Sequence, residues 1–170
     1  MVMEPERRWI ADEMLGRLAR YLRFLGYDVL YAKGMSDKAI LERAKADDRV
    51  IITRDVILSR RGGFRAVLVI SPDVNQQLKE LKVAYPSLRE DVAFLRCSSC
   101  NGALSVVDHS TPVPPKGVPE DVWTSGREVH VCVDCGQAYW EGTHTKEIRL
   151  TFERVFHGQD DTGSPGKRMD

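Results

Sequence analysis

Apolar positions in the first 95 residues follow two alternating patterns, short continuous runs and longer segments with helical spacing. Four short runs, each rich in β-branched or aromatic residues, predict strands: Trp9–Ala11, Asp28–Tyr31, Arg49–Thr53 and Ala66–Ile70. Helical spacing is found in the segments 13–25, 37–46, 56–61 and 75–83. Strands that alternate with helices in this way predict an α/β fold, in which a parallel sheet is flanked by helices.

The first helical segment has the clearest pattern. Its predicted apolar face consists of Met14, Leu15, Leu18, Leu22 and Leu25. Asp12 stands between this helix and the strand before it, and Gly26 is a stop signal at its end. Because parallel α/β sheets bind ligands beyond the carboxyl ends of their strands, Asp12 occupies a position where a ligand is expected.

The composition changes after residue 95. Residues 96–142 contain all four cysteines and four of the eight prolines, and they show no helical periodicity. Periodicity returns at 145–156, which predicts a helix that packs back on one of the domains. We therefore expect an α/β domain at 7–95, a cysteine-bearing unit with a C-terminal helix at 96–156, and a disordered tail at 157–170.

The cysteines form two C-x-x-C pairs, Cys97 with Cys100 and Cys132 with Cys135. Four thiolates in this arrangement are typical of one closed, structural zinc site. Two disulfides are the rival interpretation, which a chain without a signal peptide disfavours. His130 and His144 are possible substitute ligands. We expect the zinc to hold a ribbon folded and to take no part in chemistry.

Three acids fall where strands give way to helices: Asp12, Asp37 and Asp55. Each one alone is readily explained as a helix cap. Together at one edge of a sheet they would repel one another unless a cation compensated them. Oxygen ligands of this kind suit Mg²⁺ or Mn²⁺, so the sequence also predicts a catalytic metal site.

Charge is unevenly distributed along the chain. Residues 7–65 hold 14 Lys and Arg against 8 Asp and Glu, a net charge of +6. This balance suits a polyanionic partner, although a solvated helix surface is an equally good explanation. Arg17, Arg20 and Arg54 are the candidates for binding the phosphates of such a partner.

The sequence excludes several other classes. No apolar run approaches the roughly 18 residues of a membrane span, so we expect a cytoplasmic protein without membrane contact. No glycine-rich phosphate loop is present, which argues against a nucleotide cofactor.

Several separated motifs resemble one known family, the Mut-seven C-terminal RNase domain family. The matching segments are Ala11–Arg23, Leu25–Asp28, Asp37, Thr53–Asp55, Arg96–Asn101, Cys132–Gly136 and Tyr139–His144. The resemblance covers about residues 8–150 and implies a PIN-like nuclease domain with a zinc ribbon. It also implies metal-dependent RNase activity, with the metal carried by the residues that match the family's acidic motif, Asp12, Asp37 and Asp55.

Two functional hypotheses follow. The first is a metal-dependent ribonuclease, and in particular an endoribonuclease. The second is a catalytically silent module that binds RNA or a ribonucleoprotein, in which the acids only cap helices. Tyr139 and Trp140 are candidates for base stacking in the ribbon, although they are better explained as part of its small core.

Overall fold

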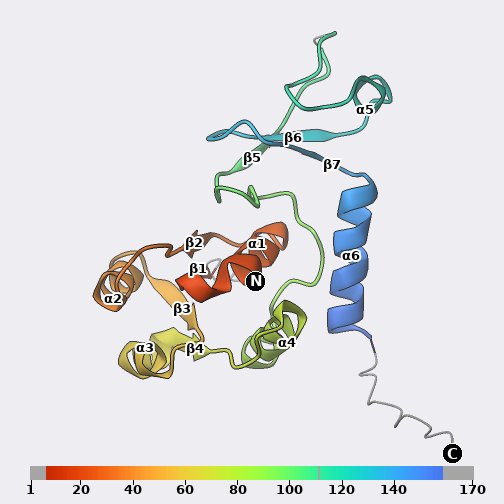
Figure 1. Cartoon of the computed structure of the whole chain (residues 1–170). Coiled ribbons are helices and arrows are strands. Elements are labelled where there is room, and N and C mark those ends of the chain that lie inside the picture. The colour runs from red at the N-terminus through yellow and green to blue at the C-terminus, as the bar shows by residue number, and fades with distance from the viewer. Residues whose placement is uncertain (1–6, 111, 159–170) are drawn as a thin grey trace, which may run out of the picture.

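A four-stranded parallel sheet forms the centre of the first half of the chain. The computed structural model describes residues 7–110 and 112–158. The strand order is β2-β1-β3-β4, with β1 at Arg8–Ala11, β2 at Val29–Tyr31, β3 at Arg49–Thr53 and β4 at Ala66–Leu68. The helices that alternate with them are α1 at Gly16–Phe24, α2 at Asp37–Ala46, α3 at Val56–Gly62 and α4 at Val74–Ala84 (Figure 1). The predicted α/β class with a parallel sheet flanked by helices is confirmed.

The helices cover both faces of the sheet. Trp9 and Ile52 pack in one apolar cluster with residues of α1 and α4. Ile10 and Ile51, the adjacent positions on β1 and β3, pack in a second cluster with residues of α2 and α3. Successive side chains of a strand point to opposite faces, which is why neighbouring residues serve different layers. The result is a three-layer α/β arrangement.

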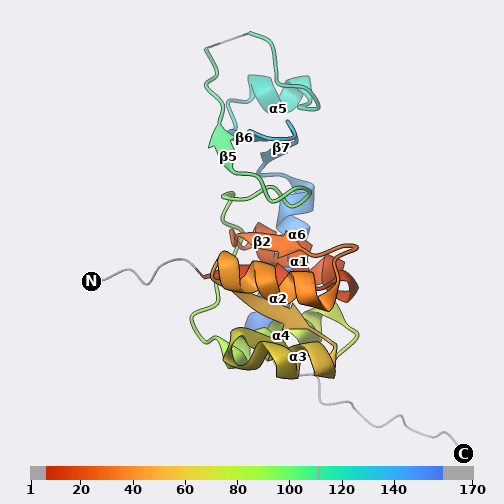
Figure 2. The ribbon, with the colours of Figure 1, turned by 90° about the vertical axis from the view of Figure 1, so that its left-hand side faces the viewer.

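The part of the chain that carries the four cysteines forms a smaller antiparallel sheet. It has the order β5-β6-β7, with β5 at Leu104–Val106, β6 at Val129–Cys132 and β7 at Ala138–Trp140. A short helix, α5 at Glu120–Thr124, packs beside it through Val122 and Trp123. The segment 96–142 shows no helical periodicity in its sequence, because α5 has only five residues, too few for a periodicity to stand out. Figure 2 shows this ribbon at one end of the molecule, next to β2.

The last helix, α6 at Thr143–Phe156, returns from the ribbon to the α/β domain (Figure 1). Phe152 is fully buried and meets the ring of Tyr21 on α1 edge to face, with 5.8 Å between the ring centroids. Ile148 and Val155 join the same core. α6 thus completes the core of the α/β domain, although the whole ribbon lies between them in the sequence. The division at residues 95 and 96 stays a prediction, and most of the predicted tail, 159–170, lies outside the described residues.

Two predicted core positions are wrong. Met14 is 63% exposed because Glu13–Leu15 forms a 3-10 turn, which puts Met14 out of phase with the apolar face of α1. Ile70 is 76% exposed because β4 is an edge strand that already ends at Leu68. Leu15, Leu18, Leu22 and Leu25 are buried as expected. None of the helices within 7–110 and 112–158 has the length and apolarity needed to cross a membrane.

Candidate functional site

The sulfur atoms of the four cysteines gather at one point between the ends of the ribbon strands. One ligand atom of each cysteine lies within 4.8 Å of the other three. The Sγ–Sγ distance is 3.6 Å for Cys97 and Cys135 and 3.4 Å for Cys100 and Cys132. A tetrahedral zinc with Zn–S bonds of about 2.3 Å needs sulfurs about 3.8 Å apart. The cysteines are free rather than disulfide-bonded, so this group is suited to hold zinc.

The backbone around the cysteines is tight, and two glycines make it possible. A Cβ at Gly102 would lie 2.4 Å from Asp134 Oδ2 and 2.8 Å from Cys132 Sγ. Gly136 has a φ of +75°, in the left-handed region that disfavours a side chain. Burial raises the pKa of Cys97, but hydrogen bonds from Tyr139 and the backbone at Cys100 outweigh it and bring that pKa to about 6. Burial is the main cause that raises the pKa of Cys100 to about 12, so all four thiols ionise together only when a cation is bound.

Both histidines considered as substitute ligands have other contacts. His130 Nε2 lies 2.9 Å from Glu128 Oε1, and its ring stacks on Phe94. His144 meets Phe24 edge to face. Neither belongs to the cysteine group within the described part of the chain.

A buried arginine joins the cysteine group to the α/β domain. Arg23 on α1 is 7% exposed, and its guanidinium donates to the carbonyl oxygens of Val29, Ser98 and Ser99. Ser98 and Ser99 separate the first two cysteines. Because four thiolates around Zn²⁺ carry excess negative charge, a cation at this position offsets it.

The first cysteine loop is also fixed to the amino end of β2. Asn101 accepts a hydrogen bond from Val29 N at 2.8 Å, and its amide nitrogen donates to Asp28 Oδ1 at 2.8 Å. Asp28 in turn receives Arg49 at 2.8 Å and Arg8 at 3.1 Å. Burial raises the pKa of Asp28, but these hydrogen bonds and charges overcome it and lower that pKa to about 2. The ribbon is therefore held in one position by a network of buried polar contacts.

The carboxyl ends of β1 and β3 carry the predicted acids Asp12 and Asp55. The two strands are hydrogen-bonded neighbours, with Ala11 opposite Ile52. Thr53 lies between the acids, since its hydroxyl donates to Asp12 Oδ2 and accepts from Asp55 N at 2.8 Å. Asp12 is 6% exposed, whereas Asp55 is exposed. The strand order reverses between β1 and β3, which is the usual position of a ligand crevice in an open α/β sheet.

Each of these acids also caps a helical turn. Asp12 Oδ1 accepts from Met14 N at 2.9 Å. Asp55 Oδ1 accepts from Ile57 N at 2.6 Å and from Leu58 N at 2.9 Å. The capping roles leave other carboxylate oxygens for a ligand, because Asp55 Oδ2 has no hydrogen bond to any described residue.

Asp37 opens α2, which follows β2, so it belongs to the same edge of the sheet. Its Oδ2 lies 3.4 Å from Arg61 Nη1 of α3. Within the ranges that the structure describes, the four cysteines are the only group of three or more potential ligands gathered within 4.8 Å. Asp12, Asp37 and Asp55 thus share an edge without forming such a group.

The three predicted phosphate-binding arginines differ in their surroundings. Arg17 and Arg20 are exposed on α1, and Arg20 lies over the ring of Phe24 at 5.8 Å. Arg54 is half-buried, and its Nη2 reaches the carbonyl of Ile70 at 3.4 Å. Arg17 and Arg20 follow Asp12 in the sequence, and Arg54 directly precedes Asp55.

Sequence reasoning missed three residues that organise these sites. Thr53 was counted only as the end of a strand, although a hydroxyl beside Arg54 and Asp55 was a usable signal. Arg23 and Asn101 gave none, because their partners are distant backbone atoms.

The fold and the site define the chain as an α/β protein with a parallel four-stranded sheet and a cysteine cluster of the zinc-ribbon type. The family model described as the Mut7-C RNAse domain matches residues 7–152. The match covers most of the chain, and the chain therefore belongs to the Mut7-C RNAse domain family. No curated protein and no solved structure matches it.

Proposed function

We propose that this chain is a metal-dependent endoribonuclease that hydrolyses phosphodiester bonds of RNA. The position of Asp12 and Asp55 carries the proposal, because they follow the two strands between which the sheet order reverses. Membership of a family described as an RNAse domain makes RNA the substrate class.

The donor chemistry of this edge suits Mg²⁺ or Mn²⁺. Asp12 and Asp55 would be direct ligands, and Asp37 would be a ligand or would orient the attacking water. Asp12 is buried and forms no ion pair with a described residue, so its contacts are the amides of Met14 and Arg54 and the Thr53 hydroxyl. When bound, the metal would supply an activated water and neutralise charge on the phosphate.

The arginines would position the RNA backbone beside these acids. Arg17 and Arg20 lie about one turn apart on α1, which begins just after Asp12. The guanidinium of Arg54 has one hydrogen bond, to Ile70, among the described residues, which leaves donors for a phosphate. Charge-assisted contacts of this kind weaken as salt rises.

Cleavage of single-stranded and structured RNA by the zinc-loaded protein with Mn²⁺ tests the proposal. Asp12→Asn and Asp55→Asn keep an oxygen for the capping hydrogen bonds but remove the charge. We expect at least a 100-fold loss of cleavage, the order that loss of one electrostatic stabiliser causes. Asp48→Asn is the matched control, because Asp48 precedes the same strand β3 at its opposite end and its left-handed φ of +51° tolerates Asn. Full activity in both the Asp12→Asn and the Asp55→Asn variant would reject the assignment.

The capping hydrogen bonds favour one alternative, a silent module that binds RNA or a ribonucleoprotein. In that case Asp12 and Asp55 act only on the helices that they begin. The alternative predicts salt-sensitive RNA binding, no cleavage, and a melting temperature that Mg²⁺ and Mn²⁺ leave unchanged.

The ribbon would add contacts to the RNA or to a protein of a ribonucleoprotein. The compartment that fits best is the cytoplasm, because a reducing environment keeps four free thiols available for zinc.

A further inference from the structure

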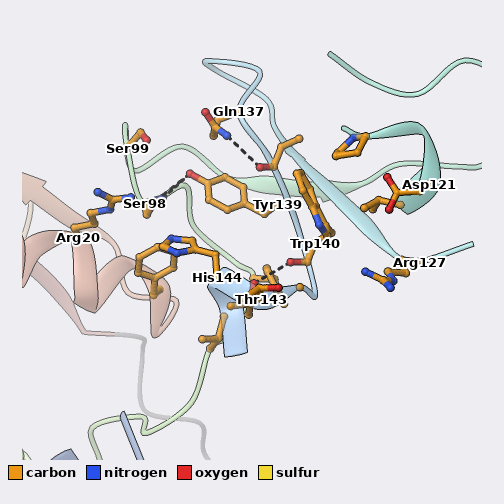
Figure 3. A pocket seen from close by; sticks show the side chains of 18 residues that line it. Arg20, Ser98, Ser99, Asp121, Arg127, Gln137, Tyr139, Trp140, Thr143 and His144 are labelled. Atoms are coloured by element: carbon orange, nitrogen blue, oxygen red, sulfur yellow. Dashed lines mark hydrogen bonds between the residues drawn. The ribbon is translucent and has the colours of Figure 1, made fainter. Parts of the chain in front are cut away.

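A cavity of about 560 Å³ lies between the ribbon and the α/β domain. It is separate from the carboxyl edge, by which we mean the edge of the parallel sheet that carries Asp12 and Asp55. Its walls come from the end of α1, from β7, from the start of α6 and from the region of α5 (Figure 3). We call it the ribbon pocket. Of the residues that the nuclease proposal uses, Arg20 lines this pocket, and Asp12, Asp37, Asp55, Arg17 and Arg54 do not.

Aromatic rings form much of the wall of the ribbon pocket. Phe24, Tyr139, Trp140 and His144 all line it. The hydroxyl of Tyr139 is fixed by Ser98 N at 3.1 Å and by Cys97 Sγ at 3.1 Å, so its ring cannot turn away. Trp140 packs partly against the small ribbon core, while its Nε1 has no hydrogen bond to a described residue. Rigid rings beside an open volume are what a stacked nucleobase needs.

Two cations also line the ribbon pocket, one toward each end in Figure 3. Neither Arg20 nor Arg127 forms an ion pair with a described residue, and both are exposed. Arg23, by comparison, is buried and donates to three carbonyl groups. Arginines without a counter-charge at both ends of an aromatic cavity suit an anionic ligand with a flat ring system.

One acid, Asp121, lies near Arg127 in the wall (Figure 3). Its carboxylate has no ion-pair partner among residues 7–110 and 112–158. A carboxylate would repel a bare phosphate, but it accepts hydrogen bonds from the amino groups of nucleobases. The combined lining therefore fits a nucleotide better than a simple anion or an acidic peptide.

The exposed face of α1 connects the ribbon pocket with the carboxyl edge. Arg17, Arg20 and Phe24 are spaced so that they lie along one face of this helix. The nine residues of α1 span about 12 Å, the length of about three to four stacked nucleotides at 3.4 Å each. One single strand can therefore reach from the acids to the pocket.

We propose that the ribbon pocket binds an unpaired nucleobase of single-stranded RNA, a few nucleotides from the phosphate held at Asp12 and Asp55. Phe24, Tyr139, Trp140 and His144 provide the stacking surface, and Arg20 and Arg127 contact the flanking phosphates. Duplex RNA lacks the free base that the pocket takes. This inference rests on the proposed function for the position of the cleaved bond, but binding of the base does not require cleavage.

Binding of a short single-stranded RNA to the zinc-loaded full chain, without added Mg²⁺ or Mn²⁺, tests the pocket apart from cleavage. Arg20→Gln and Arg127→Gln change exposed side chains without ion pairs and should not alter folding. Trp140→Leu keeps an apolar side chain, and we expect it to weaken binding about 5- to 150-fold, the range for one stacked base. We expect each arginine variant to weaken binding as well, because it removes a contact to a flanking phosphate. Arg60→Gln, an exposed arginine of α3, is the charge-matched control. Equal affinity of the wild type and the pocket variants would overturn the proposal.

A photo-crosslink adds a readout that does not depend on variants. RNA carrying 4-thiouridine should attach to the segment around Tyr139 and Trp140, and attachment only at other segments would contradict the pocket. Loss of binding in the variants without any wild-type cleavage would reject the nuclease and keep the pocket. Cleavage by the wild type with unchanged RNA binding in the variants would keep the nuclease and reject the pocket as an RNA site. The cavity would then be a candidate site for a protein partner.

Discussion

Aspartates lie at both ends of the parallel sheet, but their surroundings differ. At the amino end, Asp28 is held by Arg8, Arg49 and Asn101. At the carboxyl end, the buried Asp12 meets only amides and the Thr53 hydroxyl, and no described arginine or lysine forms an ion pair with it.

The difference separates a structural end of the sheet from a functional one. An acid that is fully paired with arginines stabilises the fold and offers nothing to a ligand. The ribbon is fixed at this amino end, through Asn101 and Arg23. An acid whose charge has no counter-ion in the protein remains able to bind a cation from solution. Variants that change one end of the sheet at a time therefore test whether the amino end is structural and the carboxyl end functional.

Removal of the zinc should cause the largest loss of stability, and the loss should be confined to the ribbon. Zinc supplies about 10–16 kcal/mol of apparent folding free energy in zinc-finger peptides, and Cys97→Ser removes a buried ligand. We expect the ribbon sheet to unfold while the α/β sheet keeps its secondary structure. Hydrogen exchange of both regions checks this. Protection of β6 that survives the loss of zinc would show that the ribbon needs no metal.

Neutralising one aspartate at each end of the sheet should change the free energy of unfolding by different amounts. Asp28→Asn removes the nearer of the two carboxylates that pair with Arg49, whose side chain is 7% exposed, and leaves it only Asp47 at 3.3 Å, so we expect a loss of about 3 kcal/mol of unfolding free energy. Asp12→Asn keeps the capping acceptor and should cost less than about 1 kcal/mol. Urea unfolding of both variants measures the difference. A larger cost for Asp12→Asn would reverse the roles of the two ends.

Stability at low pH should follow the pKa of Asp28. This pKa is about 2 in the folded chain, against an ordinary value of 3.8 for an aspartate. The unfolded chain binds the proton first, so the contribution is complete above about pH 5 and disappears as the pH falls to about 2. We expect the advantage of the wild type over Asp28→Asn to shrink by about 2 kcal/mol over that range. Both proteins lose zinc alike in acid, so their difference isolates Asp28; a constant difference would contradict the pairing.

The smallest effect is expected at Asp37, whose only ion pair is with Arg61 among the described residues. Both side chains are nearly half exposed, and pairs of this kind contribute about 0–1 kcal/mol. Arg61→Gln should leave the melting temperature almost unchanged and should free Asp37 for a metal. Differential scanning calorimetry with and without Mn²⁺ compares the two states. A melting temperature several degrees lower without metal would make Asp37 structural, like Asp28.

Local patterns predicted the helices, the strands and the four-cysteine group well, because all of them depend on the spacing of residues close together in the sequence. Strand and helix runs are read from consecutive residues, and two C-x-x-C pairs specify their own geometry. The contacts of Arg23 and Asn101 were out of reach, since they join residues 72 to 76 positions apart. Met14 was misplaced because a 3-10 turn shifts the helical phase. The aspartate cluster stays a prediction: three acids share an edge, but Asp37 turns to Arg61.

Titration of the zinc-loaded protein with Mn²⁺, followed by electron paramagnetic resonance, tests the central claim most directly. The account predicts one saturable Mn²⁺ site that Asp12→Asn and Asp55→Asn weaken at least about tenfold, the usual loss when a metal site is disturbed. Asp28→Asn should leave the Mn²⁺ affinity unchanged. Equal Mn²⁺ binding by the wild type and both carboxyl-edge variants would contradict a metal site at the ends of β1 and β3.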